Sequence, residues 1–351
     1  MAAGTKRARG VPDEGAAFRS IAYIGAKRKL ADSILDLLEE VWPDARRGAF
    51  HDAFAGGGSM AFHAAKRYSR VVCNDQELYA CAVLRAMGIA ASGAPAVDWA
   101  AVTSAPGDGY VERELCTQRR FFTPENGRVI DSVRAWLRAS DADERTKAYV
   151  LGVTVVAADR VANTTGVYGA YLKQWCARSL KPIRLDDPLQ GIAGCTVTRG
   201  CAAEAVERAA EPDVVYCDPP YTARSYSKNY HVLNIIANVS ENAELTGTSG
   251  IPATTDDTFN LRSAWNNRKN AVQALKALLT KTGARRIVMS YSTDGLMTAN
   301  EIQTAFHEAG WRGTGYSMPH KRYWAGHEDG HKNTSNLCEL LFVYERARIK
   351  A

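Results

Sequence analysis

Long apolar runs are missing from this chain of 351 residues, so no segment has the length of apolar sequence needed to cross a bilayer as a helix. The first 19 residues are polar, basic and rich in glycine and alanine, and they lack the apolar centre of a secretory signal. We therefore expect residues 1–19 to be a disordered basic arm. The sequence predicts a cytoplasmic protein without a membrane partner.

Cysteine pairs at metal-binding or redox spacing are also missing. The eight cysteines include no C-x-x-C pair, and several stand in strand-like apolar runs, which predicts reduced core thiols and no zinc site. Residues 327–331 match H-E-x-x-H, but Gly326 and Gly330 and the absence of an apolar helical face favour a polar loop. No metal site is predicted. The net charge of +6 is compatible with a polyanionic partner without requiring one.

Two phosphate-binding motifs, G-x-G-x-x-G and Gly-Lys-Ser/Thr, do not occur, which argues against a pyrophosphate ligand. A different glycine turn is present. Residues 48–54 read as a strand, Gly56–Gly58 follow, and a helix is expected from Met60 to about Tyr68. The next strand, 71–73, leads to Asp75, where a Rossmann-type unit places the acid that accepts from ribose hydroxyls. These features favour a cofactor with a ribose and a base but no phosphates, such as S-adenosylmethionine (AdoMet).

The pattern along the chain predicts one α/β domain interrupted by an insertion. Helical spacing over 31–38 and the unit above open the domain. Strands at 213–217, 286–291 and 339–344 and a helix near 267–280 continue it. Between them, residues 98–189 mix charges with aromatics and show mostly helical periodicity, as in 129–137 and 147–161. We expect a Rossmann-like α/β domain over 20–97 and 190–351, with a mostly helical insertion over 98–189.

The run Asp218-Pro219-Pro220-Tyr221 ends an apolar strand in a stiff turn. Two prolines fix the backbone and donate no hydrogen bonds, so the strand must end there. A planar ring could stack on Tyr221, while Asp218 and the carbonyl of Pro219 accept hydrogen bonds from an exocyclic amine. The turn therefore predicts chemistry on the amino group of a nucleobase.

Taken together, these motifs resemble those of the DNA N6-adenine methyltransferases of the α order. In that family the AdoMet motif precedes the target-recognition region, and the catalytic motif follows it. The resemblance covers about residues 20–345. Further matches are Ser290–Thr293 and Lys321–Tyr323, which resemble later motifs, and 163–173, which resembles part of a target-recognition region. One departure is visible, because Gly200–Ala203 offers no acidic or amide side chain near Cys201, where family members often contact the cofactor adenine.

The resemblance implies a fold, a cofactor and site residues. The fold would be that of the class I AdoMet-dependent methyltransferases, with 98–189 as the target-recognition domain. AdoMet would be the cofactor, and Asp218–Tyr221 would form the catalytic motif. The cofactor neighbours that the resemblance and the glycine turn imply are Tyr23, Lys27, Phe54, Gly56, Gly58, Asp75 and Asp218.

Basic and aromatic residues near these motifs are candidates for contacts with DNA. For Arg119 to Phe122 we expect the arginines to point outward and the phenylalanines to lie in the core. After the catalytic turn, a basic and aromatic stretch could clamp phosphates around the target nucleotide. The full set of candidates is Arg119, Arg120, Tyr168, Lys173, Arg224, Lys228, Asn229 and Tyr230.

The resulting hypothesis is a site-specific methyltransferase that moves a methyl group from AdoMet to the N6 atom of a flipped-out adenine in duplex DNA. We expect a prokaryotic, nucleoid-associated enzyme that can have a cognate restriction endonuclease as its partner. The sequence leaves three alternatives open, which are adenine in RNA, N4 of cytosine, and a catalytically silent DNA-binding homologue. Neither the recognised DNA sequence nor the oligomeric state follows from the chain.

Overall fold

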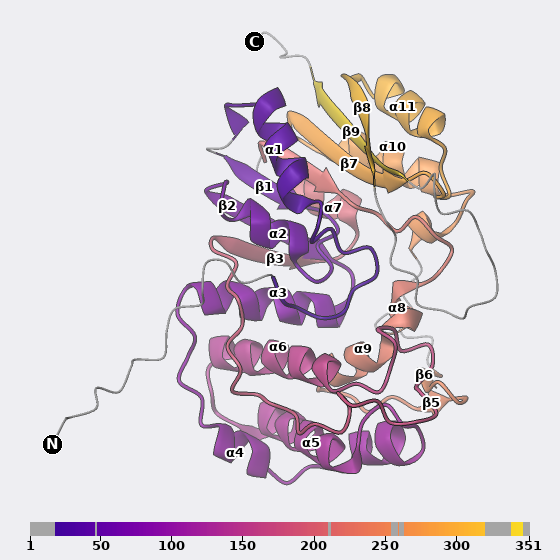
Figure 1. Ribbon diagram of the computed structural model, residues 1–351. Coiled ribbons are helices and arrows are strands. Elements are labelled where there is room, and N and C mark those ends of the chain that lie inside the picture. The colour runs from indigo at the N-terminus through magenta and orange to yellow at the C-terminus, as the bar shows by residue number, and fades with distance from the viewer. Residues whose placement is uncertain are drawn as a thin grey trace, which may run out of the picture.

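The computed structural model describes residues 18–45, 48–209, 212–253, 259, 263–319 and 338–346. A central sheet is covered by helices on both faces, and a further group of helices lies outside one of them (Figure 1). The predicted arm lies outside the described residues except for Phe18 and Arg19, and so do Lys321–Tyr323 and 327–331. Within the described part of the chain, no helix has both the length and the apolar character needed to span a membrane.

Seven strands form the central sheet in the order β3-β2-β1-β4-β7-β9-β8. The first five strands in this order run parallel, while β9 pairs antiparallel with both β7 and β8. The strands are β1 (Ala49–Asp52), β2 (Arg70–Asp75), β3 (Cys195–Arg199), β4 (Val214–Cys217), β7 (Arg286–Ser292), β8 (Trp311–Pro319) and β9 (Cys338–Arg346). A mostly parallel sheet with helices on both faces is the doubly wound, Rossmann-like architecture that the sequence predicts.

Two groups of helices cover the two faces of this sheet. The first group is α1 (Ala31–Val41), α2 (Ser59–Ala64) and α3 (Leu78–Ala91), and the second is α7 (Ala202–Arg208), α10 (Ala271–Lys281) and α11 (Ala299–Glu308). Helix α1 shows why they form, because Ile34, Leu35 and Leu38 recur at helical spacing and are fully buried. The side chains of each group bury the apolar residues of one sheet face.

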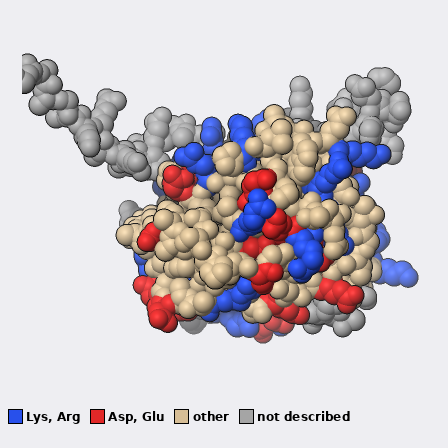
Figure 2. Space-filling view, turned by 90° about the horizontal axis from the view of Figure 1, so that it is seen from below, with Lys and Arg blue, Asp and Glu red and all other residues tan. Residues whose placement is uncertain are grey.

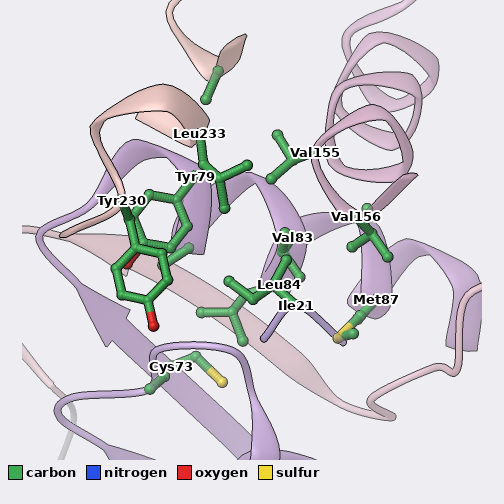
Figure 3. Packing of buried hydrophobic residues seen from close by; sticks show 14 of the residues in the cluster. Ile21, Cys73, Tyr79, Val83, Leu84, Met87, Val155, Val156, Tyr230 and Leu233 are labelled. Carbon is green, nitrogen blue, oxygen red and sulfur yellow. The ribbon is translucent and has the colours of Figure 1, made fainter. Parts of the chain in front are cut away.

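A second helical layer packs on the outer side of α3. It contains α4 (Trp99–Ser104), a π-helix η2 (Glu112–Thr117), α5 (Pro124–Ala139), α6 (Glu144–Arg160), α8 (Tyr226–Asn229) and α9 (His231–Ala237). Figure 3 shows the contact, where Val83, Leu84 and Met87 of α3 meet Val155 and Val156 of α6 and Leu233 of α9. Because α3 is buried on both sides, the helical layer and the sheet share one continuous core.

The predicted insertion supplies most, but not all, of this layer. Helices α4 to α6 confirm the helical periodicity of the insertion, although residues 162–194 contain no helix or strand. The chain after the turn Asp218–Tyr221 adds helices α8 and α9 to the same layer. It also adds a small hairpin, β5 (Leu245–Thr246) and β6 (Ile251–Pro252). The predicted strands are confirmed within a few residues, whereas α2 ends four residues before Tyr68.

Candidate functional site

Three carboxylates lie at the carboxyl ends of neighbouring parallel strands. Asp52 ends β1, Asp75 ends β2, and Asp218 follows β4 directly. The chain runs outward from β1 through β2 to β3 and then crosses back to β4 on the other side of β1, so the topological switch point lies between β1 and β4. Ligands of doubly wound sheets bind in the crevice outside such a point. A cavity of about 480 Å³ lies there and includes all three carboxylates in its lining.

Charges in the cavity are strongly one-sided. Four carboxylates line it, Asp52, Asp75, Glu77 and Asp218, and Lys27 is the single Lys or Arg among the described lining residues. Burial raises the pKa of all four acids, to about 7 for Glu77 and to about 6 for Asp218. Buried carboxylates are costly to ionise without a counter-charge, so the cavity favours a ligand that carries positive charge.

Asp75 is held in place by the backbone of its neighbours. Its two side-chain oxygens accept hydrogen bonds from the N–H of Gly56 at 2.8 Å and the N–H of Glu77 at 2.9 Å. A carboxylate has about four acceptor positions, so Asp75 keeps capacity for a ligand hydroxyl. Asp52 accepts one longer bond, 3.3 Å, from the N–H of Phe54. Its carboxylate therefore has capacity for a donor such as an ammonium group.

The glycine turn fits closely against Tyr23. Gly56 has a φ of +50°, and a Cβ atom there would lie 2.7 Å from the ring of Tyr23. Glycine alone combines this backbone with that close approach without strain. Tyr23 stacks in turn on Tyr226 and Tyr230, each at 5.3 Å between ring centroids. Tyr23 and Phe54, two of the predicted cofactor neighbours, line the cavity. Gly56 does not line it, but its close approach to Tyr23 fixes the ring that does.

Gly58 directly precedes α2. It does not appear among the residues that line the cavity, and a Cβ atom there would lie 3.0 Å from Leu84 and 3.2 Å from Ile192. Its φ of +82° lets the chain turn into α2. Gly58 is therefore required by the turn and by core packing, and its contact with the cofactor stays a prediction.

Lys27 connects two carboxylates beside the catalytic turn. Its Nζ lies 2.7 Å from Oδ1 of Asp218 and 3.1 Å from Oε1 of Glu339 on β9. Burial lowers the pKa of Lys27, but the charges of Asp218 and Glu339 outweigh it and the net shift is upward. For Asp218, burial raises the pKa and the Lys27 ammonium opposes that rise. Lys27 thus stays charged and favours the ionised form of Asp218, which accepts hydrogen bonds.

The turn Asp218–Tyr221 and the residues that follow it are held by hydrogen bonds from Leu296 and Asn266. The carbonyl of Tyr221 accepts from the N–H of Leu296 at 3.0 Å, and the amide of Asn266 donates to the carbonyls of Thr222 and Arg224. Pro219, Pro220 and Tyr221 line the same cavity as Asp218. The sequence-predicted Tyr23, Lys27, Phe54, Asp75 and Asp218–Tyr221 are therefore brought together around one space.

Several residues in or beside the cavity were not predicted. Asp52 could have been found, because it ends a strand as Asp75 does. Glu77 accepts from the hydroxyl of Ser227 and the amide of Asn234, and neither partner is near it in the sequence. Glu339 comes from the other end of the chain and carries no sequence signal. Where the sequence departs from the family pattern, Cys201, Ala202 and Ala203 line the cavity. Trp265 also lines it and packs edge-on against Phe54.

The structure divides the candidate DNA contacts into two groups. Arg120, Lys173, Arg224 and Lys228 are exposed. Asn229 is half-buried, and its carbonyl accepts from the N–H of Tyr168. Arg119, Tyr168 and Tyr230 are buried, so for these three residues the prediction is wrong, and they are described next.

Each of the buried residues has an internal partner that explains its position. Arg119 donates to the carbonyls of Leu245 and Gly247, the hydroxyl of Tyr168 donates to Asp159, and the hydroxyl of Tyr230 accepts from Ile24 N–H. Of the pairs at 119–122, Phe121 and Phe122 are fully buried as predicted, but of the arginines only Arg120 points outward.

Comparison with known proteins gives a family match and several relatives. The model of the family described as D12 class N6 adenine-specific DNA methyltransferase matches residues 23–276. The chain is 29% identical to the type II methyltransferase M.NlaIII of Neisseria lactamica, over 92% of this chain and 97% of that protein. It is 27% identical to M.CviAII of Paramecium bursaria Chlorella virus 1, over 83% and 89%. With M.FokI of Planomicrobium okeanokoites it shares 28% identity, but spans only 52% of that protein.

Proposed function

Because this chain belongs to the D12 class of N6 adenine-specific DNA methyltransferases, we propose that Asp218, Pro219 and Tyr221 bind and orient the target adenine beside the cofactor. The observation that supports this assignment is the position of the turn Asp218–Tyr221, which lines the same cavity as the strand-end carboxylates Asp52 and Asp75. The enzyme methylates adenine in DNA and depends on AdoMet.

The residues of the cavity fit AdoMet. Its sulfonium and ammonium groups are positive, which suits a lining with four carboxylates and a single Lys or Arg among the described residues. We assign Asp75 to the ribose hydroxyls and Asp52 to the ammonium group, since both carboxylates keep acceptor capacity. Tyr23, Phe54 and the segment Cys201–Ala203 supply apolar walls for the rest of the cofactor. When bound, AdoMet supplies a methyl group already activated by the adjacent sulfonium.

Asp218 and Pro219 act on the acceptor. The lone pair of the adenine amine is delocalised into the ring, which makes the amine a poor nucleophile. Acceptance of its two N–H bonds by the Asp218 carboxylate and the Pro219 carbonyl favours a pyramidal nitrogen whose lone pair is available. The proton is then lost to solvent. Asp218 orients and stabilises rather than acting as a strong base, and Lys27 keeps it ionised for that task.

Access to the amine requires the adenine to leave the duplex. Flipping costs a few kcal/mol, and stacking of the base on Tyr221 offsets part of that cost. We assign sequence recognition to the insertion 98–189 and catalysis to 20–97 and 190–351. The exposed Arg120, Lys173, Arg224 and Lys228 are the candidates for phosphate contacts. The names of the relatives support a further proposal, that an endonuclease of the same recognition sequence is the functional partner.

The test is transfer of labelled methyl from AdoMet to unmethylated mixed-sequence duplex DNA, followed by nucleoside analysis. We expect N6-methyladenine from the wild type. We expect a loss of about 100-fold or more in Asp218→Asn, which keeps the shape of the side chain but not its charge. Asp36→Asn, which removes one partner of an exposed ion pair with Arg67, is the matched control and should keep full activity.

Other outcomes would contradict the assignment in distinct ways. Label in N4-methylcytosine, or transfer only to RNA when RNA is offered in a parallel reaction, would keep the cavity as the AdoMet site and change the acceptor. Full activity in Asp218→Asn would remove Asp218 from the reaction. Absence of AdoMet binding in the wild type would identify a silent DNA-binding homologue.

A further inference from the structure

A small hairpin follows α9 and lies beside the insertion. Strands β5 and β6 contribute two residues each, and the turn Gly247–Gly250 joins them (Figure 1, lower right). A hairpin of this size is not stable by itself. Its position must therefore be fixed by contacts with the rest of the protein.

Buried side chains of the helical layer supply these contacts. Arg119 is 5% exposed, and its guanidinium donates to the carbonyls of Leu245 and Gly247 at 3.3 and 3.1 Å. A Cβ atom on Gly250 would lie 2.7 Å from Arg119, and the φ of Gly250 is +69°, so glycine is required at this close approach. Tyr110, also buried, donates its hydroxyl to the carbonyl of Ala243 at 2.6 Å.

His231 joins the hairpin to the wall of the cofactor cavity. One ring nitrogen lies 2.7 Å from the carbonyl of Ser249, and the other lies 2.9 Å from the carbonyl of Lys228. Lys228 belongs to α8, whose Tyr226 and Ser227 line the cavity. One imidazole ring therefore connects the hairpin turn to the helix that forms a wall of the active site.

The outer surface of the turn is polar, and three exposed basic residues are joined to it through neighbouring residues. Thr246, Gly247 and Thr248 are exposed, and Ser249 is half-buried. The exposed Arg120 follows the anchoring Arg119 and donates to the carbonyl of Lys173 at 3.0 Å. The exposed Lys228 is joined to the turn through its backbone carbonyl, which lies against the ring of His231. The exposed Glu241 and Glu244 shortly precede β5, so both signs of charge occur near the turn.

A different face of the same layer has another character. Figure 2 shows the side on which α4 and α5 lie, where acidic and basic residues are intermingled. Ion pairs there, such as Arg128 with Glu112 at 2.5 Å and Arg138 with Asp108 at 2.9 Å, neutralise each other. That face therefore offers no excess of one sign to a polyanion.

We propose that the hairpin turn Thr246–Ser249 is a DNA-contacting element, outside the insertion 98–189, that rests on the duplex backbone beside the target adenine. The proposal rests on the proposed function, because it takes duplex DNA as the partner. Hydroxyls and main-chain N–H groups are common phosphate donors, and Arg120, Lys173 and Lys228 supply the complementary charge. The buried anchors hold the turn at a fixed position relative to α8, so the contact sets the register of the duplex over the cavity.

Substitutions of opposite charge at Thr248 test this contact. Thr248 is exposed, so neither variant disturbs the core. We expect Thr248→Asp to weaken binding to a short mixed-sequence duplex by about tenfold at low salt. We expect Thr248→Lys to strengthen binding and to steepen the plot of log K against log salt by about one, which is one added phosphate contact. The KM for AdoMet should be unchanged in both.

The same pair of substitutions at Thr103, an exposed threonine on α4, is the control. We expect neither Thr103→Asp nor Thr103→Lys to change DNA binding as strongly, because α4 lies away from the hairpin (Figure 1). The proposal is overturned if the Thr248 variants bind the duplex with wild-type affinity and salt dependence, or if the Thr103 variants match them. Failure of the proposed function would look different, since the wild type would then transfer no methyl to adenine while the binding measurement still decides the contact.

Discussion

Glu339 provides a sharp test of the electrostatics of the site. It is 4% exposed on β9 and shares the Lys27 ammonium with Asp218, at 3.1 and 2.7 Å. The two carboxylates repel each other, and this repulsion adds to the burial that raises the pKa of Asp218 to about 6. Glu339→Gln keeps the size of the side chain and removes its charge, so the pKa of Asp218 should fall.

The size of the effect follows from the geometry. Because both carboxylates contact the same Nζ, they lie no more than about 6 Å apart, where two unit charges at an effective dielectric of about 20 interact by about 3 kcal/mol. One pKa unit corresponds to about 1.4 kcal/mol, so an unscreened interaction at this separation changes the pKa by about two units. Solvent screening reduces this, since the Asp218 side chain is 18% exposed. We expect a change of about one pH unit.

The assay is kcat/KM for DNA as a function of pH. Asp218 must be ionised to accept hydrogen bonds, so activity is present above its pKa and is lost as the pH falls through it. The acid limb should lie near pH 6 in the wild type and move to lower pH in Glu339→Gln. Lys27→Met should move the limb to higher pH, because it removes the cation that favours the ionised acid.

Glu308→Gln, which removes the charge of an exposed residue paired with Lys276, is the matched control and should leave the profile unchanged. An acid limb that stays in place in Glu339→Gln, or that moves to higher pH, would refute the reasoning. In the second case Glu339 would matter mainly because it holds Lys27 in position. Both results are distinct from simple loss of folding, which would lower activity at every pH.

Three further predictions address the base, the cofactor and the helical layer. Tyr221→Ala should lower kcat/KM for DNA by about 10-fold or more, because stacking of a base is worth about 1–3 kcal/mol, whereas Tyr221→Phe should keep most activity. The affinity for AdoMet, measured by calorimetry, should fall as the pH drops below about 7, because protonation of Glu77 removes a negative charge that favours a cationic ligand. Glu77→Gln should make the affinity less dependent on pH in this range. Arg134→Met should lower the free energy of unfolding by about 3 kcal/mol in urea titration, because the buried guanidinium donates to the carbonyls of Ile235, Asn238 and Glu241; an unchanged midpoint would contradict this.

The sequence predicted those parts of the site that follow from local pattern. The strand after the glycine turn ends at Asp75 and places it at the carboxyl edge of the sheet, and the two prolines follow β4 directly before Tyr221. Glu339 could not be predicted this way, because its role depends on the pairing of β9 with β7, which brings it opposite Ser292. Pairing between distant strands is not encoded in the spacing of residues along either strand.

The errors at Arg119, Tyr168 and Tyr230 have one cause. In sequence, an arginine or tyrosine next to other basic and aromatic residues looks like a surface for nucleic acid. In the structure, each of the three is buried and bonded to a distant part of the chain. Long polar side chains can be buried when their polar ends find partners, and those partners become visible only once the fold is known.

Charge is what connects the fold of this protein to its chemistry. A sheet that brings Asp52, Asp75 and Asp218 to one edge creates a cavity that a cation should enter readily, but burial and then repulsion from Asp218 raise the pKa of Asp52 and oppose its ionisation. The reaction needs an ionised Asp218 as a hydrogen-bond acceptor. Lys27 allows both. Among the described acids that line the cavity, its buried ammonium group forms an ion pair with Asp218 alone, and Glu339 holds it from the other side. An uncharged residue at position 27 should therefore cost activity toward adenine near pH 6 more than it costs affinity for AdoMet.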